Sequence, residues 1–200
     1  MDFKNSNIDF LSFSGHKMCG PTGVGVLVGK RELLEEMEPI IFGGGMNSYF
    51  EEDNSYELKT VPTKFEAGTT AIAEVIGLGA TIKYLMGIGM DKIHEYEILL
   101  KNYFLDAIKD IPNLIIYNKN SDSGIIALNI DGVFAQDTSV YLNHYKIAVR
   151  AGNHCAKMLK DEIKIKNTVR VSMYFYNNYE DIDKLVEALK NSKDIFKVVL

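Results

Sequence analysis

The sequence predicts an α/β fold, because segments typical of strands alternate with segments typical of helices along all 200 residues. Two observations carry this prediction. Short apolar or alternating runs, such as residues 125–130, are bounded by turn-forming residues, which is the pattern of strands. Longer runs repeat apolar residues at helical spacing, and the clearest one, over residues 90–109, places Ile93, Tyr96 and Phe104 on one face.

The first half of the chain combines a pair of strands with two helices. Residues 8–13 alternate apolar and polar side chains, whereas residues 24–29 form a short apolar run typical of a buried strand. Gly77 and Gly79 lie inside the longer helix and indicate close packing against another element rather than a break. In chain order, the predicted elements are strands over 8–13 and 24–29, a helix over 31–37, loop over 42–54 and a helix over 71–87.

The character of the sequence changes at Pro112, after which short strands become frequent. The order strand, strand, helix, strand, strand, helix predicts a small α+β domain. We therefore expect two domains, over residues 1–88 and 89–200. The elements predicted after Pro112 are strands over 114–117 and 125–130, a helix over 135–144, strands over 147–150 and 168–173, and a helix over 179–191.

Composition argues against several classes of protein. A net charge of -5 and an isoelectric point near 5.4 give no basic field, so nucleic acid is not an expected partner. The apolar runs are short and interrupted, so we expect no membrane-spanning segment and no secretion signal. The two cysteines, Cys19 and Cys155, are too few for a disulfide framework, which favours a cytoplasmic location. Together with four scattered histidines they lack the spacing of a zinc site, so no metal is expected.

The first segment that could carry chemistry is SGHKMCGPTG, residues 14–23, which joins the first two predicted strands. Its glycines and its proline allow the backbone to turn sharply. Lys17 is therefore held on a turn at the end of a strand, beside Ser14 and His16. Such a turn presents an amine to bound chemistry, although a surface lysine in a glycine-rich hairpin also fits the composition.

The second segment is RAGNHC, residues 150–155, which leaves a strand through glycine and enters a lysine-rich stretch ending at Lys166. A polar segment of this kind is expected to be an exposed, mobile loop. His154 and Lys157 are basic neighbours of Cys155, and such neighbours favour the thiolate. The sequence therefore predicts a reactive cysteine on this loop.

The third segment is VRVSMY, residues 169–174, which places Arg170 on a strand. The planar guanidinium group can make two parallel hydrogen bonds to a carboxylate. An arginine that pairs with a structural acid is the alternative from the residues alone.

Taken together, these segments resemble the class V aminotransferases and, within that group, the cysteine desulfurases of the sulfur-mobilisation type. The resemblance implies fold type I of the transferases that depend on pyridoxal 5'-phosphate (PLP). Residues 1–88 would be the C-terminal part of the large cofactor-binding domain, and residues 89–200 the small domain that carries the cysteine loop. The implied roles are Lys17 as the catalytic lysine that forms a Schiff base with PLP, Ser14, His16 and Thr69 as contacts to the cofactor phosphate (Thr69 from a partner subunit), Cys155 as the catalytic sulfur acceptor, and Arg170 as the residue that binds the substrate carboxylate.

The resemblance also implies a reaction and its partners. L-Cysteine would give up its sulfur to Cys155, leaving L-alanine and an enzyme persulfide for iron–sulfur cluster assembly, in a homodimer that serves a sulfur-acceptor protein. A selenocysteine lyase or another class V lyase is the alternative on the same scaffold. Because the N-terminal half of the family has no counterpart in these residues, we expect a C-terminal half only. By itself this half would bind PLP weakly or not at all and would be weakly active or inactive, and an inactive fragment or one half of a split enzyme is a further alternative.

Overall fold

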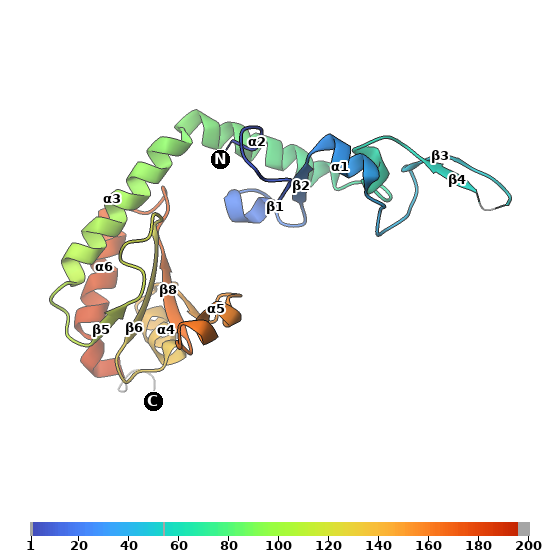
Figure 1. Cartoon of the computed structure of the whole chain (residues 1–200). Helices are drawn as coiled ribbons and strands as arrows, with labels where there is room; N and C mark the ends of the chain where they lie inside the picture. Colours follow the sequence, from blue (N-terminus) through green and yellow to red (C-terminus); the bar gives the residue numbers. More distant parts are fainter. Residues whose placement is uncertain (1, 54, 196–200) are drawn as a thin grey trace. The chain divides into compact units, whose positions relative to one another are not determined.

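The structure is a computed structural model, and it describes residues 2–53 and 55–195 of the chain. It divides into two compact units, Met1–Gly87 (unit 1) and Ile88–Leu200 (unit 2), which are described separately. The ribbon is coloured along the sequence in Figure 1, so that unit 1 runs from blue to green and unit 2 from green to red.

Unit 1 begins with two antiparallel strands, β1 (Phe10–Ser14) and β2 (Gly25–Gly29), joined by a turn that contains a 3-10 helix over Gly15–Met18. The expected burial of the second strand is wrong, because its residues are half-buried or exposed and Leu27 is 52% exposed. Two strands pair only with each other, and no third strand joins them among the described residues. An apolar strand in such a pair keeps one face uncovered.

The other elements of unit 1 include a hairpin where loop was expected over residues 42–54. Figure 1 shows this hairpin extending away from the rest of unit 1. The prediction of loop was wrong because this stretch shows no alternation of apolar and polar residues, and backbone pairing alone defines its strands. The bounds are α1 (Arg31–Glu36), β3 (Asn47–Phe50), β4 (Tyr56–Leu58), a 3-10 helix over Thr63–Phe65, and α2 (Ile72–Ile88).

Helix α2 packs against the turn that follows β1. A Cβ atom added at Gly77 would lie 2.8 Å from Pro21 Cγ, so only glycine fits at this approach. Gly79, by contrast, has nothing within 4 Å of its added Cβ atom. Close packing is therefore confirmed at Gly77 and wrong at Gly79.

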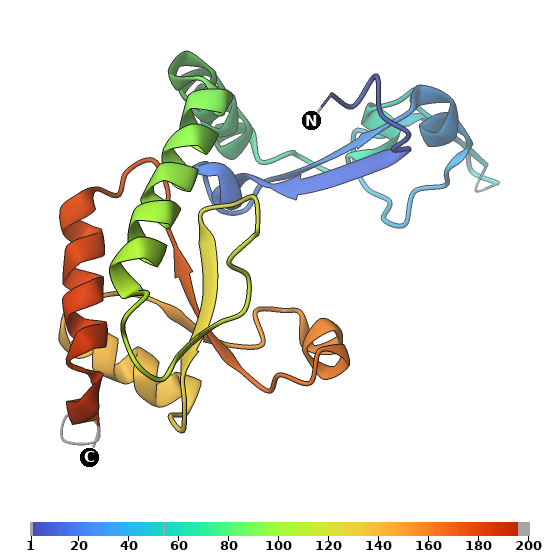
Figure 2. The same ribbon diagram turned by 60° about the vertical axis from the view of Figure 1, so that its left-hand side comes forward.

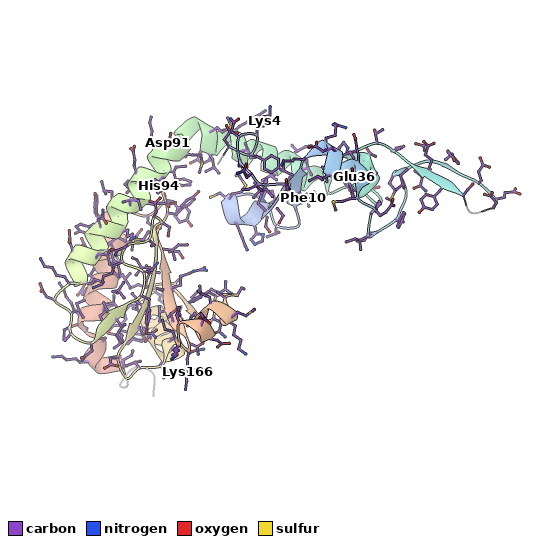
Figure 3. All side chains as sticks on the ribbon, in the orientation of Figure 1. Lys4, Phe10, Glu36, Asp91, His94 and Lys166 are labelled. Carbon is purple, nitrogen blue, oxygen red and sulfur yellow. The ribbon has the colours of Figure 1, made fainter. Side chains whose placement is uncertain are left out.

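Unit 2 is a four-stranded antiparallel sheet in the order β5-β6-β8-β7, with three helices packed on one face. Helices α3 and α6 run side by side in Figures 1 and 2, and α3 also contacts the β5–β6 turn, where His94 Nε2 lies 3.1 Å from Asp122 Oδ1 (His94 is labelled in Figure 3). The bounds are α3 (Met90–Ile108), β5 (Leu114–Ile116), β6 (Ile125–Ile130), α4 (Ala135–His144), β7 (Arg150–Gly152), α5 (Lys157–Glu162), β8 (Thr168–Ser172), α6 (Tyr179–Lys190) and a 3-10 helix over Ser192–Asp194.

The two faces of this sheet differ because side chains alternate along each strand. Val169 and Val171 of β8 are buried in the core under the helices, together with Ile126 and Leu128 of β6. The side chain of Arg170 lies on the opposite face, which α3, α4 and α6 do not cover. The alternation therefore places an arginine on the open face of a well-packed sheet.

Two predictions near the cysteine segment are wrong. The strand expected over residues 147–150 is β7 at Arg150–Gly152, because pairing with β8 sets its position, while Ile147 and Val149 pack against the core. The segment expected to be loop up to Lys166 contains helix α5 over Lys157–Glu162. Lys166, labelled in Figure 3, lies on the connection from α5 to β8.

Within residues 2–53 and 55–195, no single helix is long and apolar enough to span a membrane; α2 and α3 pass that test only when they are counted together across their break. The same residues contain no group of three or more His, Cys, Asp or Glu side chains that could hold a metal ion.

Candidate active site

The turn that carries Lys17 is closed by two backbone hydrogen bonds. The Gly15 amide donates to Val24 O at 2.9 Å, and the Gly20 amide donates to Gly15 O at 2.9 Å. A Cβ atom would lie 2.9 Å from Val24 Cγ1 at Gly15 and 2.8 Å from Gly15 O at Gly20. Any other residue at either glycine would push the turn open, so the sequence fixes the backbone beneath the lysine.

The side chains on this turn are available to a ligand. Lys17 is exposed, and its ammonium has no hydrogen bond or ion pair within the described part of the chain. His16 is exposed beside it, and Ser14 precedes the 3-10 helix without using its hydroxyl group as a cap. A hollow of about 480 Å³ adjoins them, lined by Ser12, Phe13, Ser14, Lys17 and Met18. The structure therefore brings Ser14, His16 and Lys17 together on one turn.

Thr69 belongs to the same unit but to a different segment. It is exposed, and it follows Gly68, whose amide donates to Gly44 O at 2.8 Å. No hydrogen bond joins Thr69 to the lysine turn in the part of unit 1 that is described. Its expected role, which involves a partner subunit, stays a prediction.

Cys155 lies on a tight turn at the end of β7. His154 and Cys155 have φ values of 54° and 62°, so two consecutive residues adopt the left-handed conformation that non-glycine residues seldom occupy. The turn leaves Cys155 exposed, with Arg150 Nη2 3.7 Å from its Sγ atom. A guanidinium donor beside a sulfur favours the anionic form of that sulfur.

His154 does not act as the cationic neighbour of Cys155 that the sequence indicated. Its Nε2 atom lies 3.0 Å from Thr168 O and 2.9 Å from Thr168 Oγ1. Burial, and then the positive charge of Lys160, hold the pKa of His154 below its ordinary value of 6.5, with Thr168 opposing them and Arg170 and Arg150 adding smaller effects. The lowered pKa favours the neutral ring, and the guanidinium group of Arg150 is the charge that lies beside the thiol.

Arg170 lies directly opposite Arg150 in the register of β7 and β8. Its Nε atom is buried and has no hydrogen-bond partner, and no carboxylate forms an ion pair with it among residues 2–53 and 55–195. The described residues therefore give no support to the alternative that this arginine pairs with a structural acid. Two like charges facing each other across strands are unfavourable, and an anionic ligand between them would relieve that repulsion.

The structure thus gathers two sets of candidate residues, one in each unit. Ser14, His16 and Lys17 share the turn in unit 1, while Cys155 and Arg170 share the open face of the sheet in unit 2. Sequence reasoning missed the contact from Arg150 to the thiol, although this residue opens the RAGNHC segment. The signal that was available is the position of Arg150 two residues before Gly152, on the strand that leads into the turn of Cys155.

Comparison with known proteins defines the class of the chain. The family model described as aminotransferase class-V matches residues 1–185, and the chain belongs to this family. A probable cysteine desulfurase of Staphylococcus aureus (strain Mu50) is 46% identical over 198 residues, which are 98% of this chain and 48% of that protein. The resemblance inferred from the sequence is therefore confirmed.

Solved structures agree with this assignment. The cysteine desulfurase CsdA of Escherichia coli has a TM-score of 0.89 and 38% identity, and the match covers 94% of this chain and 47% of that one. C-DES, in a mutant with glycine covalently linked to its PLP cofactor, shares the fold at a TM-score of 0.76 and 19% identity, over 96% of this chain and 48% of that one. The expected α/β fold of type I PLP-dependent transferases is thus confirmed. The chain spans about half the length of the relatives it matches.

Proposed function

We propose that this chain supplies the C-terminal half of a PLP-dependent cysteine desulfurase. The observation that carries the proposal is the open face of unit 2, where an exposed Cys155 lies 3.7 Å from Arg150. Arg170 stands opposite Arg150 and has no acidic partner among the residues that the structure describes. A thiol beside a cation suits sulfur transfer, and a free strand arginine suits the carboxylate of an amino acid.

The lysine turn fits the cofactor that the family implies. Lys17 has an unpaired amine beside a hollow, and the Ser14 hydroxyl is not used by the turn, so both groups are free to hold PLP. When bound, PLP supplies an electron sink for chemistry at the substrate α-carbon. Lys17 would hold the cofactor through Nζ and would move a proton at the substrate α-carbon, with Ser14, His16 and a partner's Thr69 at the phosphate.

The residues of unit 2 would then perform the sulfur transfer. Arg170 binds the carboxylate of L-cysteine through its guanidinium group and so orients the substrate sulfur. The Cys155 thiolate, beside Arg150, attacks that sulfur: a sulfur–sulfur bond forms, the carbon–sulfur bond of the substrate breaks, and its β-carbon gains a proton. The products are L-alanine and a persulfide on Cys155, which balances one thiol and one L-cysteine.

The proposal extends to partners and setting. Exposure of Cys155 suits delivery of the persulfide sulfur to an acceptor protein for iron–sulfur cluster assembly. The uncovered apolar side chains of unit 1, such as Ile40 at 96% exposure and Ile76 at 68%, suit burial against the other half of the enzyme and in a homodimer. We place the protein in the cytoplasm, where two free cysteines stay reduced.

The experiment compares the 200-residue chain with the same chain joined to the N-terminal half of the Staphylococcus aureus relative. We expect the joined protein to form L-alanine and a persulfide on Cys155 detectable by mass spectrometry, and the chain alone to show weak cofactor absorbance and weak activity. Lys17→Ala should abolish the bound-cofactor absorbance, and Cys155→Ala should abolish the persulfide. Cys19→Ala is the matched control, because Cys19 is the other exposed free thiol.

Three results would contradict the proposal or redirect it. A persulfide that survives in Cys155→Ala and disappears in Cys19→Ala would refute the assignment of the sulfur acceptor. Selenium release that survives Cys155→Ala while sulfur transfer is lost would favour a selenocysteine lyase. A joined protein that binds PLP without any turnover would favour an inactive fragment.

A further inference from the structure

Helix α5 places a lysine where an apolar residue is expected. Lys160 is only 7% exposed, whereas its neighbours Met158 and Leu159 are 86% and 59% exposed. Lysine is almost never fully buried without a partner, and a surface helix normally turns its apolar residues inward. The inverted orientation of this short helix therefore requires a specific interaction for the ammonium group.

That interaction joins the cysteine turn to the neighbouring strand. Lys160 Nζ donates to Gly152 O at 2.5 Å and to Thr168 Oγ1 at 2.8 Å. These two acceptors belong to residues that pair across β7 and β8. His154 binds the same threonine, so one hydroxyl group is shared by the lysine and the histidine. The ammonium group thus links the last residue of β7 to the first residue of β8 through two hydrogen bonds.

The charged groups that act on His154, which shares Thr168 with Lys160, are all basic. Burial lowers the pKa of Lys160, and the groups that face His154 in the same cluster are Lys160, Arg170 and Arg150. No carboxylate forms an ion pair with Lys160 in the described part of the chain. Such a site is costly unless each donor is satisfied, and the carbonyl and the hydroxyl supply that satisfaction.

Gly152, whose carbonyl accepts from Lys160, lies directly before the left-handed turn at residues 154–155. Gly152 has a φ value of 122°, and His154 and Cys155 follow in the left-handed conformation at 54° and 62°. Non-glycine residues hold such conformations only where surrounding contacts stabilise them. Lys160 and His154 both anchor this turn to Thr168, and the anchored turn brings Cys155 to Arg150.

We propose that Lys160 is a positioning residue for Cys155. By binding the Gly152 carbonyl and the Thr168 hydroxyl, it holds the left-handed turn at residues 154–155 and so keeps the thiol beside the Arg150 guanidinium. The inference rests on the proposed role of Cys155 as the sulfur acceptor and adds the group that fixes its place.

The test measures the thiol of the full 200-residue chain directly, with iodoacetamide as the probe and Cys19→Ala as the background. Lys160→Met should make Cys155 react about three-fold slower at pH 7, because the sulfur loses its guanidinium contact. Lys166→Met is the matched control, since Lys166 is an exposed lysine on the connection from α5 to β8, and it should leave the rate unchanged.

A second readout follows His154 by NMR titration. Lys160→Met removes a positive charge near the ring, so the pKa of His154 should rise, whereas Lys166→Met should not shift it. Near-UV circular dichroism of the tyrosines checks that each variant is folded. If Lys160→Met does not fold, Thr168→Val and Thr168→Ser decide: the first should slow alkylation of Cys155 and the second should preserve its rate.

The proposal is overturned if Lys160→Met is folded and matches the parent in both the alkylation profile and the His154 titration. It is also overturned if Thr168→Val and Thr168→Ser react at the same rate. Neither readout needs PLP or L-cysteine, so these failures are distinct from a failure of the desulfurase proposal.

Discussion

The two units differ in how completely each one buries its own apolar residues. In unit 2, helices α3, α4 and α6 and the sheet enclose a continuous core that includes Phe104, Leu128 and Tyr141 at 0% exposure. In unit 1, the buried apolar residues among those described are Met46, Leu78 and Leu85. Ile40 and Ile76 are instead left uncovered. The unit with the cysteine thus carries its own core, whereas the unit with the lysine offers surface to something else.

The comparison separates the two halves of the proposed chemistry. Sulfur acceptance belongs to the unit with the complete core, which we expect to hold its geometry unaided. Cofactor binding belongs to the unit with few buried apolar residues, and we expect it to depend on burial against further polypeptide. The following substitutions test the difference, in order of decreasing effect.

The largest effect is expected from removing core volume in unit 2. Phe104→Ala should destabilise this unit by about 3–5 kcal/mol, because it leaves a cavity in a closed core. Leu27→Ala, at a half-exposed position of β2, should change stability by no more than about 0.5 kcal/mol. Native-state hydrogen exchange, read for each unit separately, measures both. Equal losses at the two positions would remove the distinction between the units.

A smaller effect is expected at the helix caps. Asn178 caps α6 in a capping box, where its side chain accepts from the Asp181 amide at 2.9 Å. Asn178→Ala should therefore cost about 1 kcal/mol in unit 2. Ser14→Ala removes a residue that makes no side-chain cap, so its effect should stay within about 0.5 kcal/mol. Native-state hydrogen exchange measures both losses of stability. A larger loss for Ser14→Ala than for Asn178→Ala would contradict the assignment of Asn178 as a cap and of Ser14 as a residue without that role.

The smallest effect is a pH dependence within unit 2. Burial against the β5–β6 turn raises the pKa of Glu97 above its ordinary value of 4.5, with the Gly124 amide and His94 opposing it. The folded state then holds the proton more tightly than the unfolded state, so this group costs stability as pH rises from about 4.5 through its folded pKa. Because solvent screens this partly exposed carboxyl, Glu97→Gln should lose this dependence and gain no more than about 0.5 kcal/mol at pH 7.

The control for this measurement is Glu95→Gln, an exposed carboxyl on the same helix. Urea unfolding of each variant at pH 4 and pH 7 gives the comparison. If Glu97→Gln and Glu95→Gln show the same change between the two pH values, burial of Glu97 has no effect on stability.

The local sequence pattern predicted most of the helices and strands that pack against a hydrophobic core. The period of α3 and the alternation of β6 and β8 were readable because Phe104, Leu128 and Val169 each lie toward the same core. The hairpin of β3 and β4 lies outside such a core, and the stretch that contains β3, residues 42–54, carries no alternation of apolar and polar residues. The burial of β2 was predicted wrongly for a related reason. The apolar character of a strand shows that burial would be favourable, but it does not show whether another layer of the fold is present to cover it.

The candidate site shows the same limits. Lys17, Cys155 and Arg170 could be singled out because each lies in a segment with a recognisable pattern. The turn of His154 toward Thr168 could not be predicted, because it depends on a contact between two strands. Lys160 could not be predicted at all, since a lysine in a polar stretch gives no sign of burial.

The alternation of side chains in β8 limits which mutations this strand can accept. Valines on one side and an arginine on the other are set by the same alternation, so a single inserted or deleted residue would bury the guanidinium and expose the valines. Substitutions that keep the length and the register of the strand can alter the open face without disturbing the helices on the other face. On that face the exposed Ser172 can be varied, whereas Thr168 is buried and bonded to Lys160 and His154, and a change in the length of the strand is not tolerated.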